Sequence, residues 1–239
     1  MPAEIFNIHL WSILVALLSA SSCALLGTFL VLRKDSLLGD AISHAILPGL
    51  ALAFLLSGSR ASIFMFIGAS IFGLLTAVIA QFLNRYCKVD QGASLGVVFT
   101  TFFAIGVILI RLAADKVDLD PGCVLYGLLE FTAFDTMSFW GFNLPRAFII
   151  LSFCFLFVLA FISILYKELK ISSFDAVLAT TLGINSNLIH FLLSAAVAIV
   201  SVASFESVGS ILVVAMFIIP GSVARPRHAR HVADARAEH

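Results

Sequence analysis

The chain has 239 residues, of which 61% are hydrophobic and 12% are charged, and its formal net charge at pH 7 is zero. Soluble globular proteins are nearer to about 45–50% apolar and about 25% charged. The composition therefore excludes a soluble protein and indicates an integral membrane protein of one domain. The zero net charge gives no reason to expect a nucleic-acid partner. The four cysteines are scattered and form no CxxC pair, which argues against a disulfide framework or a zinc site.

Seven apolar segments follow one another along the chain, and a membrane-spanning helix needs about 20 such residues. They run over Leu10–Leu32, Leu37–Leu56, Ile63–Leu83, Ala93–Leu112, Ala147–Tyr166, Leu188–Ala203 and Val208–Pro220. No basic region precedes the first segment, so we expect no cleaved signal peptide and expect this span to serve as the targeting signal. Pro48 and Gly49 interrupt the second segment, which predicts a kink or break at that point.

A long interruption separates the fourth span from the fifth. It opens with the polar, turn-rich stretch DKVDLDPG, in which three aspartates are best explained by a solvated loop, because the pattern of an EF-hand is missing. The apolar stretch that follows is too short to cross a membrane. We therefore expect a re-entrant or interfacial helix over Val124–Phe134, and no β-sheet anywhere in the chain.

A second short helix is predicted over Ser172–Gly183, between the fifth and sixth spans. Ser172 or Ser173 can cap its start, Asp175 suits its first turn, and Gly183 suits its end. After the last span, apolar residues stop. Residues 1–224 are thus expected to form the membrane domain, and residues 225–239, RPRHARHVADARAEH, a polar and disordered tail.

The distribution of Lys and Arg predicts the orientation, because these residues accumulate on the cytoplasmic side. With seven alternating spans and the N-terminus outside, the inner side carries ten of them and the outer side carries four. This orientation places the DLDPG loop outside and the Ser172–Gly183 helix inside.

The second span carries Asp40 and His44 within an otherwise apolar sequence. On an α-helix, a spacing of four residues advances about 400° and rises roughly 6 Å, so both side chains share one face. An ionisable group within a span costs about 2.5–3.5 kcal/mol on insertion scales and marks a functional site by default. A carboxylate and an imidazole in this arrangement can bind one divalent cation together. The alternative is a mutually satisfied pair that only fixes helix packing.

Two further ionisable residues lie near span ends. Glu206 is expected at the outer mouth of the seventh span, where it is a weaker candidate for metal entry. His190 lies near the start of the sixth span, where packing at the membrane interface is the default interpretation.

Several motifs resemble, in the same order, those of the permeases of the zinc/manganese/iron family of ATP-binding-cassette importers. RKDSLLGDAISHAILPG is similar to that family's pattern of a basic residue followed by SLLGDAxSHAxLPG. FDAVLATTLGI resembles its cytoplasmic coupling helix, roughly FDxxxAxxxG, and VGSILVVAMFIIPGSVA resembles its later VGxxLVxAxLIxPAxxA segment. DLDPGCVLYG is similar to its outer-loop stretch. The tail departs from this pattern, which implies that the C-terminal part of the family fold is missing.

The resemblance implies an all-α, polytopic permease subunit in the bacterial inner membrane that is not itself an enzyme. Its partners would be a separate ATPase, an extracytoplasmic metal-binding protein, and a second copy or a paralogue of the permease. Asp40 and His44 would lie on the path of a transported Mn, Zn or Fe ion, with no permanently bound cofactor. Phe174, Asp175, Ala179 and Gly183 would belong to the coupling helix, with the last three facing the cytoplasm.

Two other classes of protein compete with this interpretation. An ion-coupled secondary metal transporter would need no ATPase, and the coupling-helix pattern argues against it. A membrane enzyme such as an intramembrane protease is disfavoured because the chain has neither HExxH nor a second intramembrane aspartate. The chain also lacks the P-loop pattern GxxxxGK[ST], so we expect another chain to hydrolyse ATP.

Overall fold

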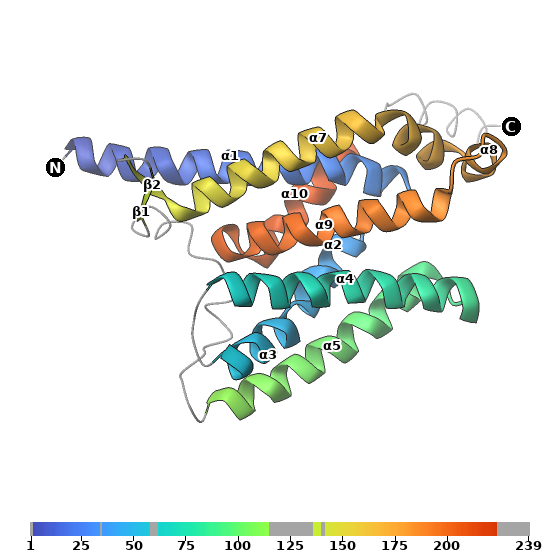
Figure 1. The fold of residues 1–239 in the computed structure, drawn as a ribbon, viewed down its shortest axis with the longest axis horizontal. Helices are drawn as coiled ribbons and strands as arrows, with labels where there is room; N and C mark the ends of the chain where they lie inside the picture. Colours follow the sequence, from blue (N-terminus) through green and yellow to red (C-terminus); the bar gives the residue numbers. More distant parts are fainter. Residues whose placement is uncertain (1, 34, 58–61, 115–135, 140–141, 224–239) are drawn as a thin grey trace, which may run out of the picture.

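The computed structural model describes residues 2–33, 35–57, 62–114, 136–139 and 142–223, and it shows a bundle of long helices (Figure 1). The helices are α1 (Pro2–Leu32), α2 (Leu38–Ala45), α3 (Leu47–Ser57), α4 (Ser62–Cys87), α5 (Gln91–Ala114), α7 (Arg146–Phe174), α8 (Ala176–Thr181), α9 (Ser186–Val208) and α10 (Ser210–Val223). A short hairpin of β1 (Thr136–Phe139) and β2 (Phe142–Pro145) precedes α7. The prediction of a polytopic helical membrane protein is confirmed.

Six helical segments among the described residues are long and apolar enough to cross a membrane, with α2 and α3 counted as one. The seventh predicted span corresponds to α10, which has only 14 residues. At a rise of about 1.5 Å per residue, α10 falls short of the hydrocarbon thickness of about 30 Å. The expected count of about seven is therefore met by six long spans and one shorter apolar helix.

The second span is broken, as Pro48 predicts. Helix α2 ends at Ala45 and α3 begins at Leu47, which places Pro48 in the first turn of α3, where its missing N–H is tolerated. Gly49 lets this helix approach α4 closely, because a Cβ atom at that position would lie 2.4 Å from the carbonyl oxygen of Gly68.

The β-hairpin corrects the expectation that the chain contains no β-sheet. Its two strands pair antiparallel, with Thr136 opposite Pro145 and Phe139 opposite Phe142. Aromatic and β-branched residues favour extended pairing, and these strands are too short to give a clear period in the sequence. The predicted interfacial helix over Val124–Phe134 lies outside the described residues, as does the predicted tail of residues 225–239.

The predicted cytoplasmic helix is divided differently from expectation. Helix α7 continues through Phe174, and the shorter helix α8 begins after Asp175. The prediction that Ser172 or Ser173 caps it is wrong, because both hydroxyls accept hydrogen bonds from Arg33 instead. Asp175 adopts an extended backbone and caps α8 by accepting from the backbone N–H groups of the next turn, at 2.9 and 3.0 Å. Gly183, with φ of +81°, follows the helix end as predicted.

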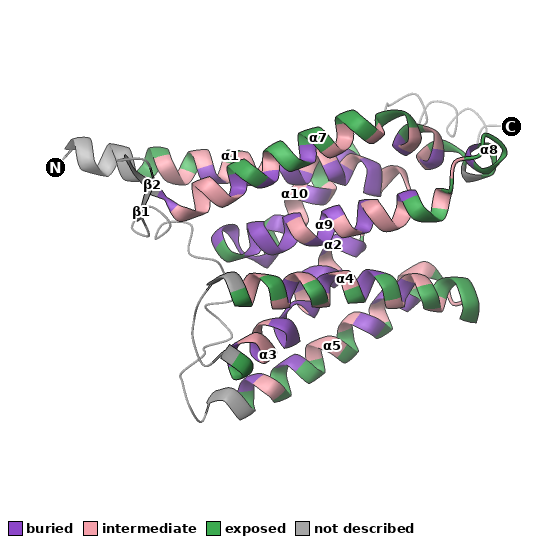
Figure 2. Cartoon of the chain, in the orientation of Figure 1, coloured by how far each residue is buried: buried purple, intermediate pink, exposed green. Residues whose placement is uncertain are grey.

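The most buried helices lie at the centre of the bundle. In the most apolar 18-residue stretch of α2–α3, 67% of the residues are buried, and the share in α9 is the same. The corresponding share in α5 and in α7 is 22% (Figure 2). Helix α2 contacts α4, α5, α9 and α10. Gly39 of α2 packs against Phe217 of α10, whose ring would lie 3.2 Å from an added Cβ atom. The helix that carries Asp40 and His44 is therefore held on most of its circumference by other helices.

Candidate metal path and the polar network beside it

Asp40 and His44 lie one turn apart on α2, as their spacing predicts. The distance from His44 Nε2 to Asp40 Oδ1 is 3.4 Å, and the exposed fractions of the two side chains are 32% and 40% respectively. The six residues of α2 that face the other helices are buried, namely Leu38, Gly39, Ala41, Ile42, Ser43 and Ala45. Asp40 and His44 therefore occupy the one strip of α2 that the bundle leaves accessible.

Aromatic rings of α5 border this strip. The imidazole of His44 lies 5.8 Å from the ring of Phe99 and 6.0 Å from that of Phe103, measured between centroids. The Phe103 ring is nearly perpendicular to the imidazole, at 88°. These rings border the imidazole, whose Nε2 atom faces Asp40.

The pair offers two ligands for a cation rather than a closed cage. Within the described part of the chain, no three His, Cys, Asp or Glu side chains are grouped closely enough to hold a metal ion. A structural zinc site has four protein ligands in tetrahedral geometry. An ion held by Asp40 and His44 would keep bound water or gain ligands from another chain, which suits transient binding.

Glu206 occupies a different region. It lies exposed in the last turn of α9, immediately before α10, and it lines a cavity of about 570 Å³ together with Arg146 and Phe66. The rest of that lining is apolar except for Cys154. Neither Asp40 nor His44 lines this cavity, so the structure does not group Glu206 with the pair.

The four residues expected in the coupling helix have distinct environments. Phe174 and Asp175 are exposed, and so is Gly183 in the turn after α8. Ala179, in contrast, has an exposed fraction of 0%. The expectation that Ala179 faces the cytoplasm is therefore wrong, because the short helix packs this residue against the protein. The outward side of the segment carries exposed apolar side chains, namely Phe174, Val177, Leu178 and Leu182.

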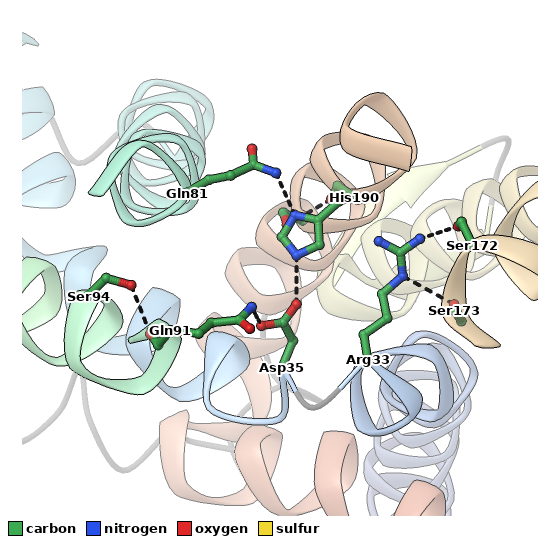
Figure 3. A network of polar contacts seen from close by, with 9 residues as sticks. Arg33, Asp35, Gln81, Gln91, Ser94, Ser172, Ser173 and His190 are labelled. Atoms are coloured by element: carbon green, nitrogen blue, oxygen red, sulfur yellow. Dashed lines mark hydrogen bonds and ion pairs between the residues drawn. The ribbon is translucent and has the colours of Figure 1, made fainter. Parts of the chain in front are cut away.

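A second Asp–His pair, which the sequence interpretation missed, lies between α1 and α9. Asp35 Oδ2 is 2.6 Å from His190 Nε2, and only 3% of the Asp35 side chain is exposed (Figure 3). The amide nitrogen of Gln91 donates to Asp35 Oδ1, and that of Gln81 lies 2.8 Å from His190 Nδ1. With Gln81 donating to Nδ1, the neutral ring carries its proton on Nε2 and donates it to Asp35.

Arg33 forms a related contact two residues before Asp35. Its guanidinium donates to the hydroxyls of Ser172 and Ser173 at the end of α7, with Nε 3.2 Å from the Ser173 oxygen (Figure 3). Burial lowers the pKa of the Arg33 guanidinium from its ordinary value, and the Asp35 charge opposes that shift. Arg33, Asp35 and His190 line one cavity of about 570 Å³ at this end of the bundle.

The sequence contained a weak signal for this network. Asp35 stands between Lys34 and the second span, and the sequence interpretation assigned it no role. His190 was assigned to packing at the membrane interface. A buried carboxylate requires a partner, but pairing two residues that are 155 positions apart requires the folded chain.

The fold and this site define a helical, multi-pass membrane protein with ionisable groups placed inside one span. A family model described as the ABC 3 transport family matches residues 5–234. The chain is 45% identical over 215 residues to the manganese transport system membrane protein MntD of Bacillus subtilis, which covers 90% of this chain and 72% of that protein. The chain therefore belongs to the ABC 3 transport family, and the family resemblance seen in the motifs is confirmed.

Other relatives agree with this assignment. The zinc transport system membrane protein TroD of Treponema pallidum is 41% identical over 208 residues, which are 87% of this chain and 57% of that protein. Among solved structures, PsaBC from Streptococcus pneumoniae in complex with Fab matches with a TM-score of 0.71 and 34% identity, over 91% of this chain and 74% of that one. The chain thus spans between about half and three quarters of the length of these relatives.

Proposed function

We propose that the protein is the membrane-spanning permease subunit of an ATP-driven importer of a divalent transition-metal ion, Mn²⁺ or Zn²⁺. The observation that carries the proposal is the Asp40–His44 pair, with its two polar groups 3.4 Å apart on the accessible strip of a span. Relatives named as manganese and zinc transport proteins support this cargo. An Asp and a His together suit either ion, and ligand type alone does not choose between them.

Incomplete ligation suits transport. A permeating ion must bind well enough to enter the path and weakly enough to leave it. Two protein ligands from one chain satisfy the second condition. A second permease copy or a paralogue facing the accessible strip of α2 would supply further ligands while the ion is held, and would release it when the two chains move apart.

Energy would come from a separate ATPase subunit that docks on α8. Phe174, Val177, Leu178 and Leu182 leave large apolar side chains exposed on and beside this helix, and such patches mark interaction sites. In this proposal Asp175 caps the helix, and buried Ala179 lets it pack closely against the rest of the protein. An apolar pocket on the ATPase would receive the exposed side chains.

The topology follows from the same assignment. The end of the bundle that holds α8 also holds the end of α1 and the α4–α5 turn (Figure 1), and with them Arg33, Arg85 and Lys88. We infer that this end is cytoplasmic, in agreement with the positive-inside rule. The N-terminus then lies outside, in a bacterial inner membrane, where an extracytoplasmic binding protein would deliver the ion.

The docking proposal is tested by co-purification of the ATPase with Val177→Asp, which places a charge on the exposed apolar surface. We expect this variant to insert normally and to lose the ATPase, and we expect Val177→Ile to retain it. Normal retention of the ATPase by Val177→Asp would remove α8 from the docking surface.

The transport function is tested by accumulation of radiolabelled Mn²⁺, Zn²⁺ and Fe²⁺ in cells that lack the protein and then regain it together with its ATPase. We expect uptake of Mn²⁺ or Zn²⁺ to depend on the protein and to stop when the ATPase is made unable to hydrolyse ATP. Uptake that persists with the inactive ATPase would identify a secondary transporter instead.

A further inference from the structure

The connection between α1 and α2 is fastened at two points to the helices on either side of α8. Arg33 donates to Ser172 and Ser173 in the last turn of α7, and Asp35 accepts from His190 in the second turn of α9 (Figure 3). Helix α8 is the only element between α7 and α9 in the chain. One short connection is therefore tied to both flanks of the helix on which we place the ATPase.

Hydrogen-bonded turns join α8 to those flanking helices. Asp175 ends α7 and caps α8, accepting from two backbone N–H groups. On the other side, Gly183 makes the turn, and the Asn185 side chain caps α9 by accepting from the N–H of Leu188 at 3.2 Å. A displacement of α8 would thus be passed to Ser172, Ser173 and His190 through hydrogen-bonded turns.

The same connection leads directly into the helix that carries the metal pair. The backbone carbonyl of Asp35 accepts from the N–H of Leu38 at 2.9 Å, so Asp35 is bonded to the first residue of α2. Asp40 lies in the first turn of that helix. A force applied to the Asp35 side chain therefore reaches the backbone beneath Asp40 through one hydrogen bond and one helical turn.

The Asp35–His190 contact has the properties of a stiff link. It is short, at 2.6 Å, and Asp35 is almost fully buried. Gln91 from the start of α5 and Gln81 from α4 occupy the remaining polar atoms of the pair. A network in which each of these polar atoms has a partner has few alternative arrangements, so in our proposal it transmits a displacement instead of absorbing it.

We propose that Arg33 and Asp35 are positioning residues that couple α8 to the Asp40–His44 pair. The coupling has two arms. One arm is the contact of Arg33 with Ser172 and Ser173, and the other is the contact of Asp35 with His190. The proposal rests on the proposed transport function. When the ATPase moves α8, the two arms move the start of α2 and change the geometry of the metal pair. When the ion occupies the pair, the same arms carry the signal in the opposite direction, because coupling between two sites is reciprocal.

The test measures Mn²⁺ transported per ATP hydrolysed, in proteoliposomes that contain the permease with its ATPase, supplied with Mn²⁺ and the binding protein. His190→Leu keeps the bulk of the side chain and removes the donor to Asp35. The double substitution Ser172→Ala with Ser173→Ala cuts the other arm. We expect each to lower the ratio at least about fivefold, the lower end of typical coupling. His190→Gln restores a donor and is expected to recover a large part of the ratio.

Ser94→Ala is the matched control, since Ser94 lines the same cavity and its hydroxyl donates only within α5, to the Gln91 carbonyl at 2.9 Å. A purely structural network would lower the yield of assembled complex and leave the ratio per complex unchanged. If His190→Leu does not assemble, the serine double variant decides the question alone.

The test requires that the wild-type complex transports Mn²⁺ and that Asp40→Asn blocks transport. Under these conditions, the coupling proposal is overturned if the serine double variant has the wild-type ratio of Mn²⁺ to ATP. It is also overturned if every assembled variant of the two contacts has that ratio. Absence of uptake by the wild-type complex with Mn²⁺ and with Zn²⁺ would instead overturn the proposed function.

Discussion

Two Asp–His pairs lie close together in this protein and have opposite properties. Asp40 and His44 are 3.4 Å apart, partly exposed and bordered by two phenylalanine rings. Asp35 and His190 are 2.6 Å apart, with Asp35 buried and both side chains held by glutamine amides. The comparison shows that two pairs of the same residue types differ in exposure and in hydrogen-bond partners. The open pair is accessible to an ion in our proposal, whereas each carboxylate oxygen and each ring nitrogen of the closed pair already has a partner within the protein.

The largest expected difference between the pairs is in transport. Asp40→Asn and His44→Ala each remove one of the two ligands that we propose on the accessible strip of α2. We expect either substitution to reduce uptake of radiolabelled Mn²⁺ or Zn²⁺ to the level of cells without the protein. Quantification of the variants in membranes controls for expression and insertion. Full uptake by both variants would leave Asp40 and His44 as a packing pair.

The second difference is in stability, and the same substitution probes both pairs. His190→Ala leaves the buried Asp35 carboxylate without its closest partner, and loss of a hydrogen-bond partner costs a buried charged group more than about 1–3 kcal/mol. His44→Ala acts on a partly exposed pair, for which about 0–1 kcal/mol is typical. Unfolding of the purified protein in mixed detergent measures both. Equal losses of stability would show that the two pairs do not differ in the way their burial indicates.

Smaller effects should rank the members of the closed network. Gln91 donates to a carboxylate, and such hydrogen bonds contribute about 1.5–3 kcal/mol, whereas Gln81 contacts a neutral ring, for which about 0.5–1.5 kcal/mol is typical. We therefore expect Gln91→Ala to destabilise the protein more than Gln81→Ala in the same unfolding assay. The reverse order would contradict this ranking of the two contacts.

The smallest effect is expected where α5 borders the open pair. Phe103→Leu removes an aromatic contact to the His44 ring, and such contacts contribute about 0.5–1.5 kcal/mol. We expect the apparent KM for Mn²⁺ uptake to rise by about two- to tenfold, the same free energy expressed as a ratio, with membrane expression unchanged. An unaltered KM would show that the ring does not orient the imidazole.

Local features were predictable from the sequence because they depend on neighbouring residues. The apolar segments, the break at Pro48, the turn at Gly183 and the shared face of Asp40 and His44 all follow from spacing and from backbone chemistry. Features that depend on distant residues were not predictable. Ser172 and Ser173 suit a helix cap in isolation, and Arg33, which is distant in sequence, uses their hydroxyls instead.

The burial of particular side chains could not be predicted from the sequence either. Ala179 has the small size that close approach by a partner requires, but the folded chain itself packs against it. The closed pair was missed because Asp35 and His190 lie in segments that were interpreted separately. A general lesson is that an acid next to a span needs a partner, and that the partner's identity is a tertiary property.

Direct binding of Mn²⁺ to purified protein, measured by equilibrium dialysis for the wild type, Asp40→Asn and Asp35→Asn, tests the central claim most directly. The account predicts that Asp40→Asn loses the binding seen in the wild type, while Asp35→Asn keeps it, because Asp35 is already occupied by His190 and Gln91. Loss of binding in Asp35→Asn with retention in Asp40→Asn would contradict the account and place the ion at the closed pair.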